Sequence, residues 1–273
     1  MLQMQNEVPS PFPGCAQCPV EETAICRPLE GGDPDLIRRI RSEQHRLAAG
    51  SHLYREGDAY ADFFMILDGL VSLYRSFDRS FEHGGRVILD FGLPGAFIGY
   101  QPNHHDLMLH SAECLSEVTV CAFPSRSFHL LAHSNPAVAE RLAAWNWRET
   151  TIAQNHLTNM ASRPAKARIA HLLFELCTRL TCPGFGEGDE GCPIPVTQTH
   201  IADALSLNIA HVCRKLKELK REGVLEFRWG RLRVLDGHAL TKLIARRDGA
   251  VLSCGQGATA VCRVKDLPPS LAL

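Results

Sequence analysis

The chain has 273 residues, enough for two modest domains, and its content of 45% hydrophobic and 22% charged residues is typical of a soluble globular protein. No apolar stretch is long enough to cross a membrane, and the N-terminus lacks the basic start and apolar run of an export signal. We therefore expect a cytoplasmic protein without a membrane partner. Because the formal net charge is only −1, any strongly basic surface must be local.

Residues 1–35 form a cysteine-bearing segment with six acidic residues, one arginine and several prolines. Cys15, Cys18 and Cys26 make a C-x2-C-x7-C array. In a reducing compartment, the eleven cysteines of the chain are better explained as metal ligands, redox sensors or core residues than as a disulfide framework. We expect an irregular segment that is ordered mainly by whatever its cysteines bind.

Residues 36–134 are predicted to form a sensor domain built on a β-roll. A helical pattern over residues 36–49 comes first (Leu36, Ile37, Ile40, Leu47). From Ser51 to about Phe123, short β-rich runs alternate with glycines, a pattern typical of a small β-barrel or β-roll. One of these runs, EVTVCAFP, carries Cys121.

Residues 135–162 are predicted to form one long helix, with Asn135 as the cap and Pro136 in the first turn. Its apolar stripe is imperfect, because Glu149 and His156 interrupt it; the stripe consists of Val138, Leu142, Trp145, Ile152, Leu157 and Met160. We expect the helix to cover either its own roll or, preferably, the same helix of a second subunit. Placing Glu149 or His156 in that seam would keep a dimer marginal.

Residues 163–245 are predicted to form a winged helix-turn-helix domain. An amphipathic helix, AKARIAHLLFELCTRL, opens it, and residues 181–191 are expected to form a loop. Thr197 caps a first short helix, and Gly223 ends a second helix whose apolar stripe is Ile209, Val212, Leu216 and Leu219. A hairpin containing Trp229 and Gly230 follows. The tail, residues 246–273, shows no dependable pattern, and we assign it no function.

The second helix and the hairpin carry the local positive charge. From Asn208 to Val234 there are eight Lys or Arg residues and three Glu residues. A capped helix, a turn, a basic helix and a basic hairpin, in this order, indicate a reader of double-stranded DNA. The residues predicted to contact DNA are Asn208, His211, Arg214, Lys215 and Lys217.

The order of β-roll, long helix and winged helix-turn-helix resembles the CRP/FNR superfamily of bacterial transcription regulators. The resemblance rests on REGDAYADFFMILDGLVSLY, LPGAFIGYQ, PAKARIAHLLFEL and THIADALSLNIAHVCRKLKELKREGVL. It implies an α+β fold, a homodimer, a promoter operator as ligand, and contact with RNA polymerase. It also implies that Arg214 reads a guanine, with His211 at a second base edge and Lys215 and Lys217 on the phosphate backbone. The family pattern Glu-x-x-Ser-Arg is absent, since Ala210 and Cys213 replace its Glu and Ser.

Cyclic nucleotide control is not expected. Members that bind cyclic AMP resemble one another in a Gly-Glu pair and an Arg-Ser pair, and this chain has Gly99-Tyr100 and His110-Ser111 in those places. A neutral histidine cannot replace an arginine fork on a phosphate.

The cysteines suggest a metal centre instead. Three N-terminal thiolates and one from a strand suit an iron-sulfur cluster or zinc. Similarity to the FNR branch implies a [4Fe-4S] cluster held by Cys15, Cys18, Cys26 and Cys121, and hence oxygen or redox sensing. Cys114 is a rival fourth ligand, Cys177 is expected in the core, and Cys182 and Cys192 could form a second metal site or a reversible disulfide.

Other sensors remain as alternatives. They are structural zinc, a thiol switch, or haem bound by histidines such as His104, His105 and His110. A redox enzyme with an accessory DNA-binding domain is a remote alternative, because no substrate pocket, acid/base pair or nucleotide motif is recognisable.

Overall fold

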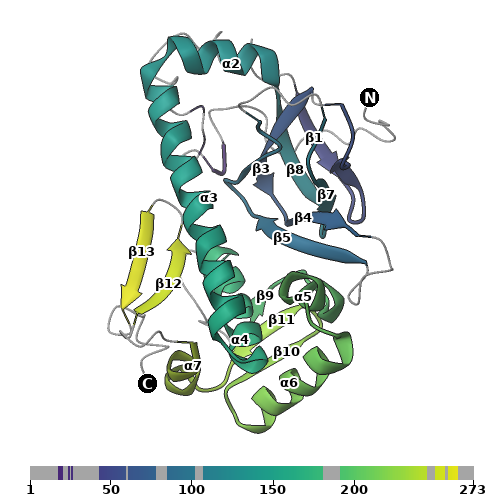
Figure 1. Ribbon diagram of the computed structural model, residues 1–273, viewed down its shortest axis with the longest axis vertical. Coiled ribbons are helices and arrows are strands. Elements are labelled where there is room, and N and C mark those ends of the chain that lie inside the picture. Colours follow the sequence, from purple (N-terminus) through teal and green to yellow (C-terminus); the bar gives the residue numbers. More distant parts are fainter. Residues whose placement is uncertain are drawn as a thin grey trace. The chain divides into compact units, whose positions relative to one another are not determined.

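The structure is a computed structural model that describes residues 18–20, 24, 26, 43–59, 61–77, 85–101, 107–180, 191–244, 250–255 and 258–263. The chain divides into two compact units, residues 1–76 with 88–147 and residues 77–87 with 148–273, and helix α3 contributes to both. Figure 1 shows the elements of each unit. No helix in the described ranges is both long and apolar enough to span a bilayer.

Two four-stranded antiparallel sheets form the first unit. One has the strand order β1-β8-β3-β6 and the other has the order β2-β7-β4-β5. The strands are β1 Gln44–Leu47, β2 His52–Tyr54, β3 Asp62–Asp68, β4 Val71–Ser76, β5 Arg86–Gly92, β6 Phe97–Ile98, β7 Ser111–Cys114 and β8 Val118–Pro124. This confirms the predicted β-roll.

The first sheet is buried on both faces, and alternation along its strands separates two cores. Phe64, Ile66 and Val120 face the second sheet, together with Leu53, Val71 and Ala112 from that sheet. Phe63, Met65 and Cys121 belong to the opposite core, with Phe128 and Val138 of the following helices. Because every second residue changes face, the position of a cysteine in β8 decides which core it enters.

The predicted helix over residues 36–49 is wrong at its C-terminal end, since Gln44–Leu47 is strand β1, paired antiparallel with β8. Residues 36–42 lie outside the described part. The four residues of β1 all retain some exposure, as expected for the edge strand of a sheet. Pairing with β8 outweighs the apolar spacing on which the prediction relied.

Two helices follow the roll. Helix α2, Ser125–Ser134, was not predicted, and it buries Phe128 and Leu131 against the roll. Helix α3 spans Pro136–Ser162, as predicted. The Asn135 side-chain oxygen accepts from the backbone N–H groups of Ala137 and Val138 at 3.1 and 3.3 Å, which confirms the predicted cap.

Helix α3 has two seams of heptad spacing rather than the single predicted stripe. One seam is buried or half-buried and consists of Val138, Leu142, Trp145, Glu149, Ile152, His156 and Asn159. The other is exposed and consists of Glu140, Ala143, Trp147, Thr150, Gln154, Leu157 and Ala161. We call the second set the outer seam. Leu157 and Met160, placed in the same apolar stripe as Val138 and Ile152 from sequence, are exposed, because they lie off the buried seam.

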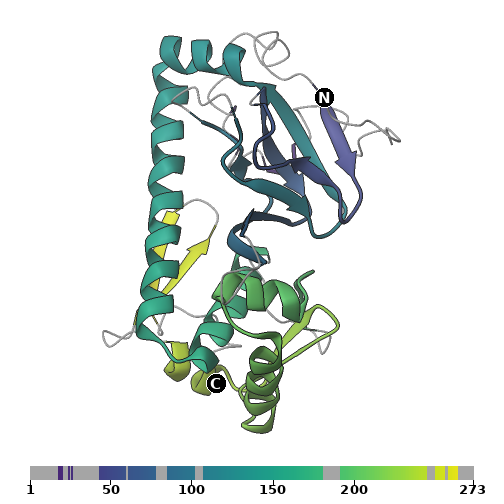
Figure 2. The ribbon, with the colours of Figure 1, turned by 45° about the vertical axis from the view of Figure 1, so that its right-hand side comes forward.

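The second unit contains the winged domain, seen from a second side in Figure 2. Its helices are α4 Ala165–Leu180, α5 Gln198–Leu205, α6 Ile209–Arg221 and α7 Gly237–Ile244. A three-stranded sheet has the order β10-β11-β9, with β9 Cys192–Pro193, β10 Leu225–Arg228 and β11 Arg231–Val234. Within residues 246–273, where no structure was predicted, Ala250–Gly255 and Ala258–Arg263 pair as the hairpin β12–β13.

Candidate DNA-binding surface and cysteine site

The first helix of the reader, α5, begins with a capping box. The Thr197 hydroxyl accepts from the His200 backbone N–H at 3.2 Å, and the Thr197 N–H donates to His200 Nδ1 at 3.2 Å. Ile201, Ala202 and Leu205 are buried, as the sequence predicted. The cap and the buried face fix where α5 begins and how it is rotated.

The turn between the two helices is made without glycine. Ser206 adopts a left-handed conformation with φ of 49°, the role that a glycine usually has. Asn208 then caps α6, since its side-chain oxygen accepts from the Ala210 N–H at 2.8 Å. The side-chain oxygen of Asn208, predicted to contact DNA, is therefore engaged in positioning the helix that carries the other candidates.

Helix α6 presents the predicted polar face. Val212, Leu216 and Leu219 are buried, while Arg214 and Lys217 are exposed and His211 and Lys215 are half-buried. Arg214 Nη2 lies 3.4 Å from His211 Nδ1, which places these two side chains together near the start of the helix. The Lys215 ammonium pairs with Glu218 at 2.8 Å. Gly223, with φ of 71°, follows the helix, as predicted.

Cys213 replaces a polar residue on the same helix. Its thiol donates to the Gln198 side-chain oxygen at 2.6 Å. This contact joins the beginning of α5 to α6 on the polar side of the helix pair. Cys213 is a free, half-buried thiol.

The sequence did not anticipate the disulfide between Cys177 and Cys192, whose Cα atoms are 6.2 Å apart. Cys177 was expected in the core, and it is fully buried but bonded to Cys192 of β9. The alternative of a site shared by Cys182 and Cys192 is therefore wrong for Cys192, while Cys182 lies outside the described residues. The bond ties the last turn of α4 to the wing sheet.

We expect this disulfide to stabilise the oxidised protein. Closing a loop between residues separated by 15 positions in the sequence contributes about 3 kcal/mol through the entropy of the unfolded chain. Adding dithiothreitol should lower the denaturation midpoint of the wild type but not that of Cys192→Ser. Cys213→Ser, a matched change of a free thiol, should keep the response to reductant. If Cys192→Ser responds as the wild type does, the disulfide does not form in solution.

The candidate cysteine site lies against the roll. Cys18 and Cys26 pack against the core that contains Cys121, together with the buried residues Val20 and Ala24. Thiolates are ligands that iron-sulfur clusters and zinc favour, and these three cysteines border one apolar core. Cys15 lies outside the described residues. Among the residues that the structure describes, no three His, Cys, Asp or Glu side chains are close enough together to hold a metal ion.

Cys114, the rival fourth ligand, belongs to the other core. It lies on β7 and packs with Leu53, Val71 and Val118 between the two sheets. Burial raises the pKa of its thiol to about 12, with a further contribution from Glu113. A thiol that stays protonated and faces the roll interior is a poor ligand for a group held by the N-terminal cysteines.

Gly99 and His110, which stand where cyclic AMP-binding members have their Gly-Glu and Arg-Ser pairs, both lie against Tyr54. The Tyr54 hydroxyl lies 2.8 Å from His110 Nε2, and the Tyr54 ring lies directly over Gly99. Burial lowers the pKa of His110, so its ring is neutral near pH 7. A neutral histidine that is hydrogen-bonded to tyrosine cannot act as a cation for a cyclic phosphate. His104 and His105, considered as haem ligands with His110, lie outside the described residues.

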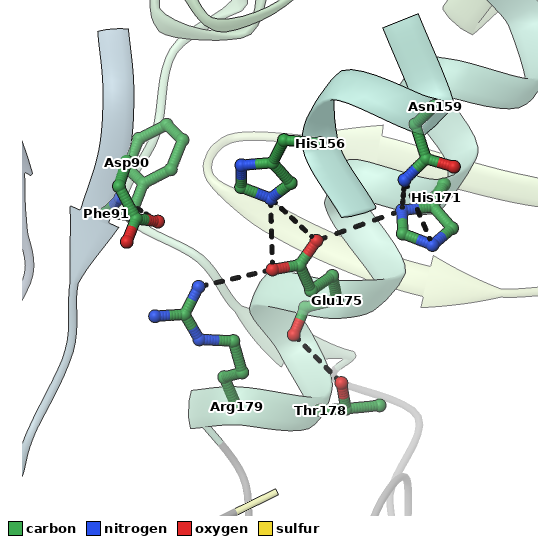
Figure 3. A network of polar contacts seen from close by, with 8 residues as sticks. All are labelled: Asp90, Phe91, His156, Asn159, His171, Glu175, Thr178 and Arg179. Atoms are coloured by element: carbon green, nitrogen blue, oxygen red, sulfur yellow. Dashed lines mark hydrogen bonds and ion pairs between the residues drawn. The ribbon is translucent and has the colours of Figure 1, made fainter. Parts of the chain in front are cut away.

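A polar network, shown in Figure 3, joins α3 to α4 inside the second unit. The buried Glu175 carboxylate is 3.0 Å from His156 Nε2 and 3.2 Å from Arg179 Nη1. His171 Nδ1 lies 3.8 Å from a carboxylate oxygen of Glu175, and the Asn159 amide nitrogen lies 3.0 Å from the same ring nitrogen. The suggestion that Glu149 or His156 lies in a dimer seam stays a prediction, and the structure gives His156 a partner within its own chain, Glu175.

The two titratable groups at the centre of the network have displaced pKa values. Burial alone would raise the pKa of Glu175, but the charge and hydrogen bond of His156 and the charges of Arg179 and His171 lower it well below its usual range. Burial lowers the pKa of His171 to about 4. At neutral pH the cluster therefore contains an ionised Glu175 and a neutral His171.

Comparisons with known proteins agree with this architecture. Residues 44–135 match the family described as "Cyclic nucleotide-binding domain", and residues 167–243 match "Crp-like helix-turn-helix domain". The nitrogen fixation regulation protein FixK of Bradyrhizobium diazoefficiens is 27% identical over 85% of this chain and 94% of its own length. The transcriptional activator protein FnrL of Cereibacter sphaeroides is 24% identical over 81% of this chain and 87% of its own length.

Solved structures show the same fold. FixK2 from Bradyrhizobium japonicum has a TM-score of 0.64 and 24% identity, covering 75% of this chain and 98% of that one. A CRP family regulator from Thermus thermophilus has a TM-score of 0.60 and 25% identity, covering 73% of this chain and 95% of its own.

Proposed function

Since the chain belongs to the CRP/FNR family of DNA-binding transcription regulators, we propose that it senses oxygen or redox state through a [4Fe-4S] cluster held by Cys15, Cys18, Cys26 and Cys121. The observation that carries the proposal is the shared core of Cys18, Cys26 and Cys121. A bound cluster would supply an oxygen-labile inorganic centre there. The alternative of a redox enzyme has no support, because the relatives are named as regulators.

The cysteines would pin the acidic N-terminal segment to the outer face of the roll. That face also receives α2 and the beginning of α3, through Phe128, Leu131 and Val138. An N-terminal segment anchored to this core would therefore stabilise the position of α3 relative to the roll. This is the route by which the state of the cysteine site would reach the long helix.

The sensing proposal is tested by metal analysis of protein purified without oxygen. Brown protein with about four irons and four sulfides per chain is expected. Colourless protein that contains one zinc per chain would indicate a structural zinc site. Metal-free protein would indicate a thiol switch, and a sharp Soret band would indicate haem. Each of these three outcomes contradicts the proposal while leaving the family assignment intact.

We propose that the active form is a homodimer joined along the outer seam of α3. This seam is exposed over its whole length and repeats every 3.5 residues on average, the spacing at which two helices coil around each other. Trp147 and Leu157 are 69% and 68% exposed, which is unusual for such large apolar side chains. A second copy of the helix would cover both.

We expect Trp147→Glu to yield a monomer. A carboxylate in place of the large indole of Trp147 would have to be desolvated in each subunit, which opposes pairing. Sedimentation of protein purified without oxygen measures the result. The control is Leu130→Glu on α2, equally exposed at 68% but off the seam, which should leave the dimer unchanged. If the Trp147→Glu protein is still a dimer, the outer seam is not the dimer interface.

The operator is proposed to be bound by His211 and Arg214 at base edges and by Lys215, Lys217 and the capped start of α6 at phosphates. The Arg214 guanidinium lies beside the His211 ring and is exposed. It could therefore donate two parallel hydrogen bonds to a guanine. Lys217 is exposed on the same helix. Contact of the DNA-bound dimer with RNA polymerase belongs to this proposal as well.

For Arg214→Ala we expect a loss of about 1 to 3 kcal/mol in operator binding and relaxed preference at one base pair. Anisotropy titration of operator duplexes with single base changes measures both effects. Lys217→Ala should instead weaken binding to all DNA sequences alike. It should also reduce the number of ions released on binding, measured from the salt dependence of the affinity, by about one. An Arg214→Ala protein that keeps its base preference would contradict the assignment.

A further inference from the structure

We propose that Cys177 and Cys192 form a reversible thiol-oxidation site in the winged domain, which peroxides or small disulfides oxidise and dithiols reduce. Oxidation joins the last turn of α4 to β9 of the wing sheet. The bond then restrains the hairpin β10–β11 beside α6 and tightens operator binding. The effect on affinity rests on the proposed DNA binding by α6, whereas the bond itself needs neither DNA nor iron.

The two cysteines are placed to bond within one and the same fold. Their Cα atoms are 6.2 Å apart, within the range of bonded cysteines, although 15 positions separate them in the sequence. Cys192 stands directly opposite Leu232 in the wing sheet, and residues paired in this way share one face. Leu232 is buried, so Cys192 lies on the inner face of the sheet, where Cys177 of α4 meets it.

The two thiols differ in their access to solvent. Cys177 is fully buried, whereas Cys192 is half-buried and precedes the exposed Pro193 on a strand at the edge of its sheet. An oxidant in solution therefore meets Cys192 first. The Cys192 thiolate attacks one oxygen of hydrogen peroxide, which gives a sulfenic acid and releases water. The Cys177 thiol then attacks the Cys192 sulfur, and a second water leaves as the disulfide forms.

Small disulfides and dithiols react by exchange at the same exposed sulfur. The Cys192 thiolate attacks glutathione disulfide and releases one glutathione, and Cys177 then displaces the second glutathione from Cys192. The two thiols of the chain are oxidised and one disulfide in solution is reduced. Reduction begins when a dithiol attacks the Cys192 sulfur and frees Cys177 as a thiol. The site is therefore reversible at a sulfur that solvent reaches.

The bond matters because the ladder that holds β9 is short. The strand consists of Cys192 and Pro193 and pairs with β11 at the edge of the sheet. Pro193 has no backbone N–H to donate to the ladder. Just after the strand, the Ile194 N–H donates to the Gly230 carbonyl at 2.7 Å. A covalent link to α4 adds an anchor that these few hydrogen bonds do not supply.

The other end of the bond is firmly held. Cys177 lies between Glu175 and Arg179, two buried residues whose side chains pair at 3.2 Å in the network of Figure 3. His156 of α3 contacts the same carboxylate. Helix α4 also packs against α5 and α6, so its last turn has a fixed position relative to the reading helix. The disulfide extends this fixed position to β9 and, through β11, to the basic hairpin.

A restrained hairpin favours DNA binding. The hairpin carries Arg228, Arg231 and Arg233, a large part of the local positive charge of the domain. A segment that is already ordered loses less entropy on binding, so the oxidised protein should dissociate from the operator more slowly. We expect operator affinity to rise roughly threefold to tenfold on oxidation. Loss of the proposed cluster should have the opposite effect, so the two redox responses differ in sign.

The test places iron-loaded, full-length protein in oxidising and reducing glutathione buffers, both without oxygen. Mass spectrometry of digested protein should find Cys177 linked to Cys192 in the oxidising buffer and both free in the reducing buffer. The operator is selected from random duplexes by the wild type, and its affinity, measured by anisotropy, should rise as stated. Hydrogen exchange at the Ile194 amide should slow roughly tenfold, because oxidation anchors the strand that precedes it.

Three variants complete the experiment. Cys192→Ser should bind the operator as the reduced wild type does and should not respond to the buffer. Cys177→Ala, which places a good helix former at the buried end of the bond, should behave in the same way, so the result does not depend on the folding of one variant. Cys114→Ser, which removes a free thiol of the roll, should respond as the wild type does.

The proposal is overturned if Cys177 and Cys192 stay free in the oxidising buffer. It is also overturned if the bond forms while Ile194 exchange or operator affinity stays unchanged, or if affinity falls. Iron-free protein separates this site from the cluster, since linkage and slower Ile194 exchange should persist there. If neither redox form binds DNA at all, the proposed function fails as well, whereas linkage and exchange still report whether the thiol site exists.

Discussion

Cys121→Ser protein prepared without oxygen should contain almost no iron and should not bind the operator as a dimer. Cys121 faces the same core as Cys18 and Cys26, so its loss would remove the one ligand supplied by the folded roll. A serine hydroxyl is a much weaker ligand than a thiolate for iron in a sulfide cluster. Iron and sulfide analysis and the visible spectrum of the reconstituted protein measure the result.

Cys114→Ser is the matched control for this experiment. Cys114 is as buried as Cys121 but faces the interior between the two sheets, where burial keeps its thiol protonated. Its replacement should leave the iron content unchanged. If Cys114→Ser loses iron while Cys121→Ser retains it, the fourth ligand has been assigned to the wrong strand.

For Glu175→Ala we expect a loss of about 3 to 5 kcal/mol in unfolding free energy, the cost of removing one partner from a buried ion pair. Arg179 is almost fully buried and would lose the carboxylate 3.2 Å away. His156 would lose the contact that ties α3 to α4. Urea denaturation followed by circular dichroism measures the change.

The control is Glu218→Ala, which removes a half-buried surface carboxylate paired with Lys215 and should change the denaturation midpoint little. Rescue by Glu175→Gln should be partial, because the amide keeps the shape and some hydrogen bonds but not the charge. A Glu175→Ala protein as stable as the wild type would mean that the network contributes nothing to the fold.

The same network makes stability depend on pH. The pKa of His171 is about 4 in the folded chain and about 6.5 when unfolded, so the unfolded state binds more protons between these values. Stability should therefore fall as the pH drops from 6.5 to 4. Glu175, whose pKa is lowered by folding, adds a loss at still lower pH. His171→Gln should remove the first part of this dependence.

Local signals were sufficient for much of the fold. The caps at Asn135 and Thr197 and the end of α6 at Gly223 follow from short-range rules, and all are present. The alternation of β8 was sufficient to place Cys121 in a strand. Its place in the core against which Cys18 and Cys26 pack depends on the pairing of β8 with both β1 and β3, which no local pattern encodes.

The remaining features depend on contacts between distant segments. Helix α2 has a short apolar face, and its place is decided by packing of Phe128 against the roll. The Cys177–Cys192 bond joins a helix to a two-residue strand, whereas the sequence suggested Cys182 as the partner of Cys192. His156 interrupts the apolar stripe of α3, and its ring contacts Glu175 on α4. The sequence of α3 alone does not reveal this partner.

The most direct test of the account compares operator binding by iron-loaded and iron-stripped protein, both kept strictly without oxygen. Only the loaded protein should sediment as a dimer and bind the operator tightly, and brief exposure to air should reduce both properties together. Equal dimerisation and equal affinity of the two forms would contradict control by an iron-sulfur cluster.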